Sequence, residues 1–139
     1  MSVAAHPTTA LLLIDVQESF RARPYWTDAE APAFFARTNA LLAGAQAAGI
    51  PVVQVFHTDG PNSADNAFSQ ASGLIRPLAE LTPFDAALVV EKHRHSALVG
   101  TGLSIWLHEQ GIRRLIVAGI RTEQCCETTT RHASDEGWE

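Results

Sequence analysis

The chain contains little cysteine and no long apolar stretch. Only two of its 139 residues are cysteines, and these are neighbours, Cys125 and Cys126. Neighbouring cysteines seldom bridge each other, which excludes a disulfide scaffold and favours reduced thiols in a cytoplasmic protein. No apolar run approaches the roughly 20 residues of a membrane span, and the first seven residues lack the basic start of a secretory signal. We therefore expect no membrane segment and no secretion signal.

Basic runs and nucleotide motifs are also absent. Lys and Arg total 10 against 15 Asp and Glu, and the resulting charge of −5 argues against a nucleic-acid or anionic-membrane partner. No Gly-x-Gly-x-x-Gly follows the first predicted strand, so a dinucleotide site has no support. His57, Asp59, His93 and His95 form no compact ligand pattern. We expect neither a metal nor a cofactor.

Three apolar runs each lead to a residue that can do chemistry. Residues 10–14 precede Asp15, residues 86–91 precede Lys92, and residues 115–120 lead through a short turn to Cys125. Runs this rich in Leu, Ile and Val are typical of buried parallel strands. Ligands bind outside the carboxyl ends of such strands, so a carboxylate, an ammonium group and a thiol are expected to converge at one sheet edge.

The remaining pattern predicts one α/β domain over residues 1–139. A strand is expected at 52–57 and helices at about 27–48, 103–110 and 123–135, and this order is typical of a doubly wound, mostly parallel sheet. Thr27-Asp28-Ala29-Glu30 has the form of a capping box. Residues 58–83 are expected to be loop, with a short helical turn near Leu78. The chain stops at Gly137-Trp138-Glu139, where a helix would normally lead to another strand, and we expect that a C-terminal part is missing or supplied by a partner.

The two cysteines are expected to differ. Cys125 falls in the first turn of the last predicted helix, with Thr122 as its N-cap, where free N–H groups favour a thiolate. A small buried core residue explains Cys125 equally well. Cys126 lies about 100° further round the helix, among small neighbours, and is expected to pack in the core.

A nucleophilic thiol needs a base, and the sequence offers Asp15. No histidine is expected at a strand end next to the start of the last helix, whereas a carboxylate at the buried mouth of a strand can have a raised pKa. Lys92 would pair with Asp15 and favour the thiolate. Each residue alone has an ordinary structural explanation, but their coincidence at one edge favours function.

Two further groups border this edge. Backbone N–H groups of the turn 119–122 and of Cys125 are placed to meet a developing oxyanion. Gln17, Phe20 and Trp26 follow the first strand and are expected to line a substrate pocket, although a loop packed on the sheet edge explains them equally well.

The segments Leu-Leu-Leu-Ile-Asp-Val-Gln-Glu-Ser-Phe, Lys-His-Arg-His-Ser-Ala-Leu-Val-Gly-Thr-Gly-Leu and Val-Ala-Gly-Ile-Arg-Thr-Glu-Gln-Cys-Cys-Glu-Thr-Thr resemble the isochorismatase-like cysteine hydrolases. This group contains nicotinamidases, carbamoylsarcosine amidohydrolases and isochorismatases. The resemblance implies a three-layer α-β-α fold and a catalytic triad of Asp15, Lys92 and Cys125. It also implies an oxyanion hole from the N–H groups of Arg121 and Cys125, a cis Ile120–Arg121 peptide, and a homo-oligomer.

Three departures refine the expected function. The nicotinamidase metal motif, Asp-x-His, is absent around His57. Isochorismatases acting on a vinyl ether lack the nucleophilic cysteine, so Cys125 favours the amidase-like branch. Family members also continue past Trp138. The sequence thus predicts a cysteine hydrolase that cleaves a C–N bond of a small amide or carbamoyl substrate. The alternatives are a non-hydrolytic binding or assembly member of the same fold and a vinyl-ether hydrolase.

Overall fold

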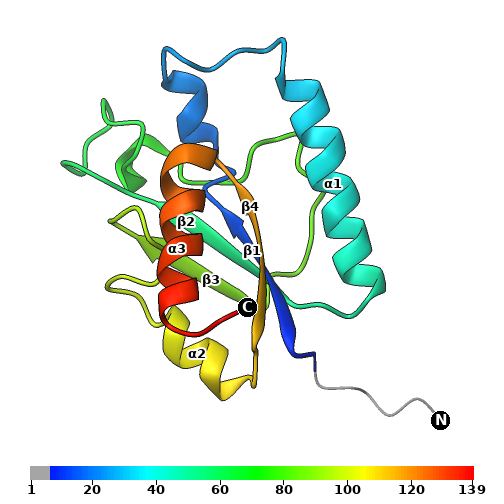
Figure 1. The fold of residues 1–139 in the computed structure, drawn as a ribbon. Coiled ribbons are helices and arrows are strands. Elements are labelled where there is room, and N and C mark those ends of the chain that lie inside the picture. Colours follow the sequence, from blue (N-terminus) through cyan, green and yellow to red (C-terminus); the bar gives the residue numbers. More distant parts are fainter. Residues whose placement is uncertain (1–6) are drawn as a thin grey trace.

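The structure is a computed structural model that describes residues 7–139 (Figure 1). Its strands are β1 (Thr9–Ile14), β2 (Val52–His57), β3 (Leu88–Lys92) and β4 (Arg114–Gly119). Its α-helices are α1 (Ala31–Ala47), α2 (Leu103–Glu109) and α3 (Glu127–Asp135). Short helical turns are η1 (Glu18–Ala22), η2 (Gln70–Ser72) and the π-helical η3 (Thr122–Cys126). The expectation about a secretion signal concerns residues outside the described range.

The four strands form one parallel sheet in the order β3-β2-β1-β4. The central strand β1 pairs with β2 on one side and with β4 on the other, so that Leu12 lies between Val53 and Val117. All carboxyl ends therefore point to the same edge. The predicted doubly wound parallel sheet is confirmed.

Side chains of β1 alternate between two cores. Leu12 and Ile14 pack in a core with Leu103 of α2 and Ala133 of α3. Leu11 and Leu13 face the opposite way, in a core with side chains of α1. Helix α1 thus covers one face of the sheet while α2 and α3 cover the other, and Figure 1 shows the three layers. An uninterrupted apolar run suits β1 because both of its faces are buried.

The prediction that all three apolar runs are buried is wrong for the outer strands. Val89 of β3 is 58% exposed, and the residues of β4 are only partly buried. Both are outer strands of the described sheet and are covered less completely than β1. Along the outer side of β4, Glu139 donates its N–H to the Arg113 carbonyl at 2.9 Å and accepts from the Leu115 N–H at 2.8 Å.

The predicted start of the first helix at Thr27 is also wrong. Helix α1 begins at Ala31, without a side-chain cap, and the Thr27 hydroxyl instead accepts the Ala29 N–H at 3.3 Å. Pro32 explains the difference. Its ring has no N–H and would clash with the carbonyl four residues earlier, so proline is tolerated only in the first turn.

Two other local predictions need correction. The helical turn expected near Leu78 is a turn closed by a hydrogen bond from the Leu81 N–H to the Leu78 carbonyl, and the helical turn of this loop is η2. The last helix was expected to begin at Glu123 with Thr122 as its N-cap. Arg121 occupies the capping position of η3 instead, and no side chain caps it. None of the helices within residues 7–139 has the length and hydropathy needed to cross a bilayer.

Candidate active site

The carboxyl ends of the strands bring the predicted reactive residues together. Asp15 directly follows β1, and Lys92 is the last residue of β3. Both side chains are fully buried, and the Lys92 Nζ lies 3.1 Å from Asp15 Oδ2. The same Nζ lies 3.3 Å from Cys125 Sγ in η3. The expected meeting of carboxylate, ammonium group and thiol therefore occurs in this structure.

His57, the last residue of β2, adds a fourth side chain. Its Nδ1 lies 2.8 Å from Lys92 Nζ. Burial, followed by the positive charge of Lys92, lowers the pKa of His57 to about 4. The ring is therefore neutral at pH 7, and its Nδ1 accepts a hydrogen bond from the ammonium group. The Arg94 carbonyl accepts another at 2.9 Å.

The expectation that no histidine lies at a strand end next to the start of the last helix is wrong, because His57 ends β2 and has a ring nitrogen within 4.8 Å of Cys125 Sγ. Outside the strands, the exposed His95 also places its Nδ1 3.7 Å from Cys125 Sγ. In the sequence both histidines were weighed as metal ligands and neither as a partner of the thiol. The signal for His57 was its position at the end of a predicted strand, whereas His95 lies in the connection after β3, which carries no comparable signal.

The surroundings of Lys92 also bear on metal binding. Ligand atoms of Asp15, His57 and Cys125 all lie within 4.8 Å of one another. The Lys92 Nζ lies within 3.3 Å of an atom of each of these residues, so an ammonium group already supplies the cation among them. A metal ion there would have to displace a fully buried lysine, so these residues do not fit a metal in this arrangement. The absence of a metal stays a prediction.

The protonation state of the Cys125 sulfur differs from the expected one. Burial, reinforced by the nearby Asp15 charge, raises the pKa of Cys125 to about 11, although Lys92 acts in the opposite direction. The expectation that this position favours a thiolate is therefore wrong for the resting site. Burial also raises the pKa of Asp15 to about 6, against the lowering effect of Lys92. At neutral pH the site thus holds a thiol next to an ionised carboxylate.

The Asp15 carboxylate has unused hydrogen-bonding capacity. Apart from its ion pair with Lys92, neither of its buried oxygens accepts a well-aligned hydrogen bond from residues 7–139. Its backbone adopts φ of +56°, an uncommon conformation for an aspartate, and its N–H is held by the Val55 carbonyl at 2.8 Å. A buried acceptor of this kind is poised to take a proton from the thiol or from a bound N–H group.

The turn after β4 supplies a backbone donor. The Ile120–Arg121 peptide bond is cis, as the resemblance implied, and within residues 7–139 the Arg121 N–H has no hydrogen-bond acceptor. Gly119 precedes this bond at φ of +140°, and a Cβ there would lie 1.9 Å from the Ile14 carbonyl oxygen. Glycine is therefore required where β4 passes the end of β1. The Arg121 N–H is available to bind an oxyanion.

The three residues predicted to bind substrate lie in two different environments. Gln17 is fully buried, and its amide donates to the His57 carbonyl at 2.9 Å and accepts the His57 N–H at 2.8 Å. It therefore fixes the backbone of His57. Phe20 and Trp26 line an apolar pocket beside Ile120 and Arg121. Substrate binding by these residues stays a prediction.

Cys126 lies in the core that packs between the sheet and α3, as expected. Burial raises its pKa to about 12. Neither cysteine forms a disulfide. The chain thus carries two reduced thiols, of which Cys125 contacts Lys92.

Comparison with known proteins agrees with this architecture. The family model of the isochorismatase domain matches residues 9–139. The chain belongs to the isochorismatase family. It is an isochorismatase-family hydrolase by this membership, and relatives in the family include amidohydrolases.

Several relatives show how far the similarity extends. The secreted isochorismatase effector Isc1 of Verticillium dahliae is 29% identical over 99% of this chain and 71% of its own length. The ureidoacrylate amidohydrolase RutB of Pseudomonas syringae is 28% identical, over 88% of this chain and 63% of its own. The crystal structure of an isochorismatase from Pseudomonas putida has a TM-score of 0.77 at 28% identity, covering all of this chain and 70% of that one. The chain thus spans roughly two thirds of the length of these relatives.

Proposed function

We propose that the protein is a cysteine hydrolase that cleaves a C–N bond of a small amide or carbamoyl compound. The single observation that carries this proposal is the contact of Lys92 Nζ with both Asp15 Oδ2, at 3.1 Å, and Cys125 Sγ, at 3.3 Å. The similarity to an enzyme named ureidoacrylate amidohydrolase supports the choice of bond.

The first half of the reaction transfers the acyl group to sulfur. Because Cys125 is a thiol at rest, its proton passes to the ionised Asp15 as sulfur attacks the carbonyl carbon. Lys92 keeps its positive charge and stabilises the developing thiolate. The Arg121 N–H, joined by that of Cys125, stabilises the oxyanion. The C–N bond then breaks, and the amine leaves with the proton held by Asp15.

The second half returns the free thiol. Water attacks the thioester carbonyl while Asp15 accepts one of its protons. The C–S bond breaks, the carboxylic or carbamic acid departs, and the sulfur recovers its proton from Asp15. His57 remains neutral throughout and holds Lys92 in place through its Nδ1.

Ammonia release from a panel of small amides, carbamoyl compounds and ureides tests this proposal. Replacing Cys125 with Ala should lower turnover by about a thousandfold or more, because the nucleophile is lost. The matched change Cys126→Ala should leave turnover within about tenfold, since Cys126 only packs in the core. Equal losses in the two variants would defeat the assignment.

One observation favours a second function, that of a non-hydrolytic member of the fold. The pKa of Cys125 lies near 11, so the resting thiol is a weak nucleophile without a substrate to draw its proton away. If this second function holds, no amide in the panel is hydrolysed, and the Cys125→Ala variant binds small amides as tightly as the unchanged chain.

Oligomeric state and location are part of the same proposal. A homo-oligomer in the cytoplasm agrees with the resemblance and with the reduced thiols. Size-exclusion chromatography with light scattering that gives a monomer would overturn the first of these predictions.

A further inference from the structure

The connection between β3 and α2 places two groups against the reactive residues. The Arg94 carbonyl accepts a hydrogen bond from Lys92 Nζ at 2.9 Å, and His95 has its Nδ1 3.7 Å from Cys125 Sγ. Figure 1 shows this connection, coloured yellow-green, beside α3. Because residues 93–98 belong to no helix or strand, their path depends on the side chains that hold them.

Helix α3 holds this connection with two side chains. The Thr129 hydroxyl accepts the Ala97 N–H at 3.0 Å, and the His132 Nδ1 lies 2.7 Å from the Ser96 hydroxyl. Thr129 and His132 are three residues apart and therefore lie on the same side of the helix. Thr129 and Ser96 are both buried, so water does not compete for their hydroxyl groups.

The contacts of His132 continue beyond Ser96. The His132 Nε2 lies 3.0 Å from Glu136 Oε1. In the tautomer that donates the Nε2–H to this carboxylate, Nδ1 is an acceptor for the Ser96 O–H. The Ser96 oxygen in turn accepts the Leu98 N–H at 3.2 Å. Each link uses a donor of one group and an acceptor of the next, which fixes residues 96–98 against α3.

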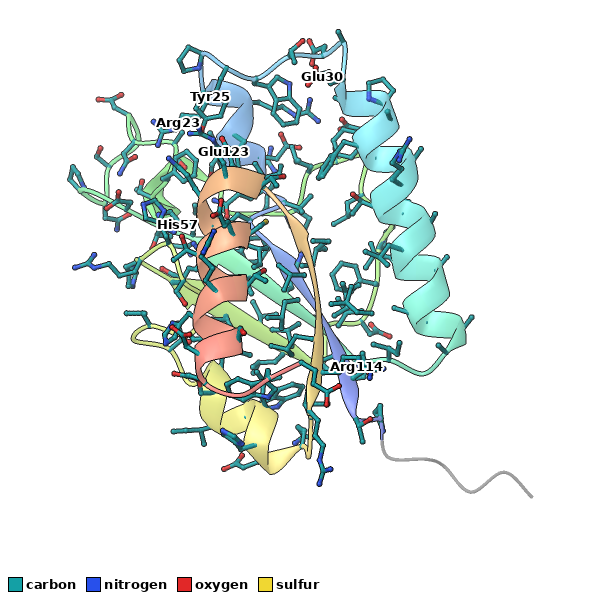
Figure 2. All side chains as sticks on the ribbon, viewed as in Figure 1. Arg23, Tyr25, Glu30, His57, Arg114 and Glu123 are labelled. Atoms are coloured by element: carbon teal, nitrogen blue, oxygen red, sulfur yellow. The ribbon has the colours of Figure 1, made fainter. Side chains whose placement is uncertain are left out.

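The nucleophile is attached to the same helix. Cys125 lies in η3, which continues without interruption into α3. Figure 2 shows Glu123 at the end of this segment that meets β4. One helical segment therefore carries the thiol and also holds the connection that brings the Arg94 carbonyl to Lys92. The 3.3 Å contact between Lys92 Nζ and Cys125 Sγ depends on both.

We propose that Ser96, Thr129 and His132 are positioning residues for the proposed reaction. They hold the connection after β3 so that Lys92 directs one N–H at the sulfur of Cys125. This inference rests on the proposed function. A carbonyl fixed in place takes one N–H of the ammonium group and so decides where the others point. Without this anchor, the thiolate that forms during attack loses part of its stabilisation.

Two changes of nearly the same shape at His132 test the proposal. His132→Asn keeps an acceptor oxygen near the place of Nδ1, whereas His132→Leu removes it. For the best substrate of the amide panel, His132→Leu should lower kcat about tenfold with KM within about twofold, because misplacement acts on the reacting groups. His132→Asn should keep kcat within about threefold of the unchanged chain.

The ranking of these two variants separates positioning from a structural role. Leucine forms helix more readily than asparagine, so a merely structural role predicts that His132→Leu is the better protein. Urea denaturation measures stability beside kcat. Equal kcat in the two variants, or a higher kcat in His132→Leu, would overturn the proposal.

A matched pair of serine changes supplies a second test. Ser104 on α2 also donates to α3, to Glu136 Oε2 at 3.1 Å, but it lies outside the anchored connection. Ser96→Ala should lower kcat about tenfold, whereas Ser104→Ala should leave it within about twofold. Equal effects of the two changes would overturn the proposal. If Ser96→Ala does not fold, the partly exposed His132 and its two variants decide.

Alkylation of Cys125 separates this inference from the proposed function, because it needs no turnover. Iodoacetamide reacts with the thiolate, and mass spectrometry measures how fast Cys125 is modified. At pH 8 the rate should fall about fivefold in His132→Leu and stay within about twofold in His132→Asn. This ranking in a chain that hydrolyses no amide would support the anchor and refute the hydrolase. Amide hydrolysis with kcat and alkylation indifferent to both changes would refute the anchor alone.

Discussion

Lys92 is the only lysine in the chain and has no contact with solvent. Its ammonium group has three N–H bonds, yet acceptors from Asp15, His57, Arg94 and Cys125 all lie within 3.3 Å. Three N–H bonds cannot each serve a different one of four acceptors, so two of the acceptors must share one N–H of Lys92. The sulfur is the weakest acceptor of the four, so its bond to Lys92 should strengthen when Cys125 becomes charged during attack.

Asp15 and His95 are rival proton acceptors, and their variants distinguish them. Asp15→Asn should lower kcat/KM by about a hundredfold or more, whereas His95→Gln should cost less than about tenfold. In the unchanged chain kcat/KM should rise with pH through about 6, because only the ionised Asp15 accepts the thiol proton. That rise should persist in His95→Gln. A rise that disappears in His95→Gln but survives in Asp15→Asn would reverse the two roles.

At the residue scale, the sequence predicted the meeting of reactive side chains that lie at the end of a strand. Asp15 and Lys92 each come directly after an apolar run, and the carboxyl ends of parallel strands lie at the same edge of the sheet. His95 could not be found this way, since its approach to Cys125 depends on the path of an irregular connection. The resting protonation of Cys125 was predicted wrongly, because the helix-end argument omitted the cost of burying a charge and the repulsion from Asp15.

At the scale of elements, the passage from β4 into η3 depends on one glycine. Gly119→Ala should destabilise the fold by about 2–3 kcal/mol, because the added Cβ would collide with the Ile14 backbone at 1.9 Å. Activity should fall as well, since both Asp15 and the Arg121 N–H adjoin this crossing. Urea denaturation and the amide assay measure the two effects.

Gly44 in α1 provides the matched control. A Cβ there meets nothing within 4 Å, so Gly44→Ala should stabilise the helix by about 0.5–1 kcal/mol and leave activity unchanged. A Gly119→Ala chain as stable as the unchanged protein would show that β1 and β4 do not approach so closely.

The course of the strands and the start of α2 at Leu103 were predictable from sequence, whereas the starts of α1 and α3 were not. Strand β1 differs from its predicted range by one residue, because an apolar run between two covering layers has little freedom. The start of α1 depends on Pro32, which the capping-box argument did not take into account. The π-helical form of η3 has no known sequence signature and was predicted as ordinary helix.

At the scale of the whole molecule, two buried groups give opposite pH dependences of stability. The pKa of His57 falls from 6.5 to about 4 on folding, so its contribution to the free energy of unfolding is lost as pH falls through that window. The pKa of Asp15 rises from 3.8 to about 6, so the stability associated with its protonation is lost as pH rises. Between pH 4 and 6 the two effects oppose each other.

Removing one of these two titrating groups should reveal the pH dependence of stability that is due to the other. In His57→Gln the amide oxygen can still accept the Lys92 N–H, but the side chain no longer titrates. Relative to the unchanged chain, this variant should gain stability as pH falls from 6.5 to 4. Urea denaturation at several pH values measures the difference, and parallel curves for the two proteins would contradict the assignment of a neutral His57.

The proposed mechanism depends most on the acyl group being transferred to the sulfur of Cys125. Mass spectrometry can detect that acyl group directly. After brief exposure to 4-nitrophenyl acetate and an acid quench, trypsin should release residues 122–131, which contain both cysteines between Arg121 and Arg131. We predict one acetyl group on Cys125, retained in Cys126→Ala and lost in both Cys125→Ala and Asp15→Asn. An acetyl group on Cys126, or labelling of Cys125 that does not need Asp15, would contradict the proposed site.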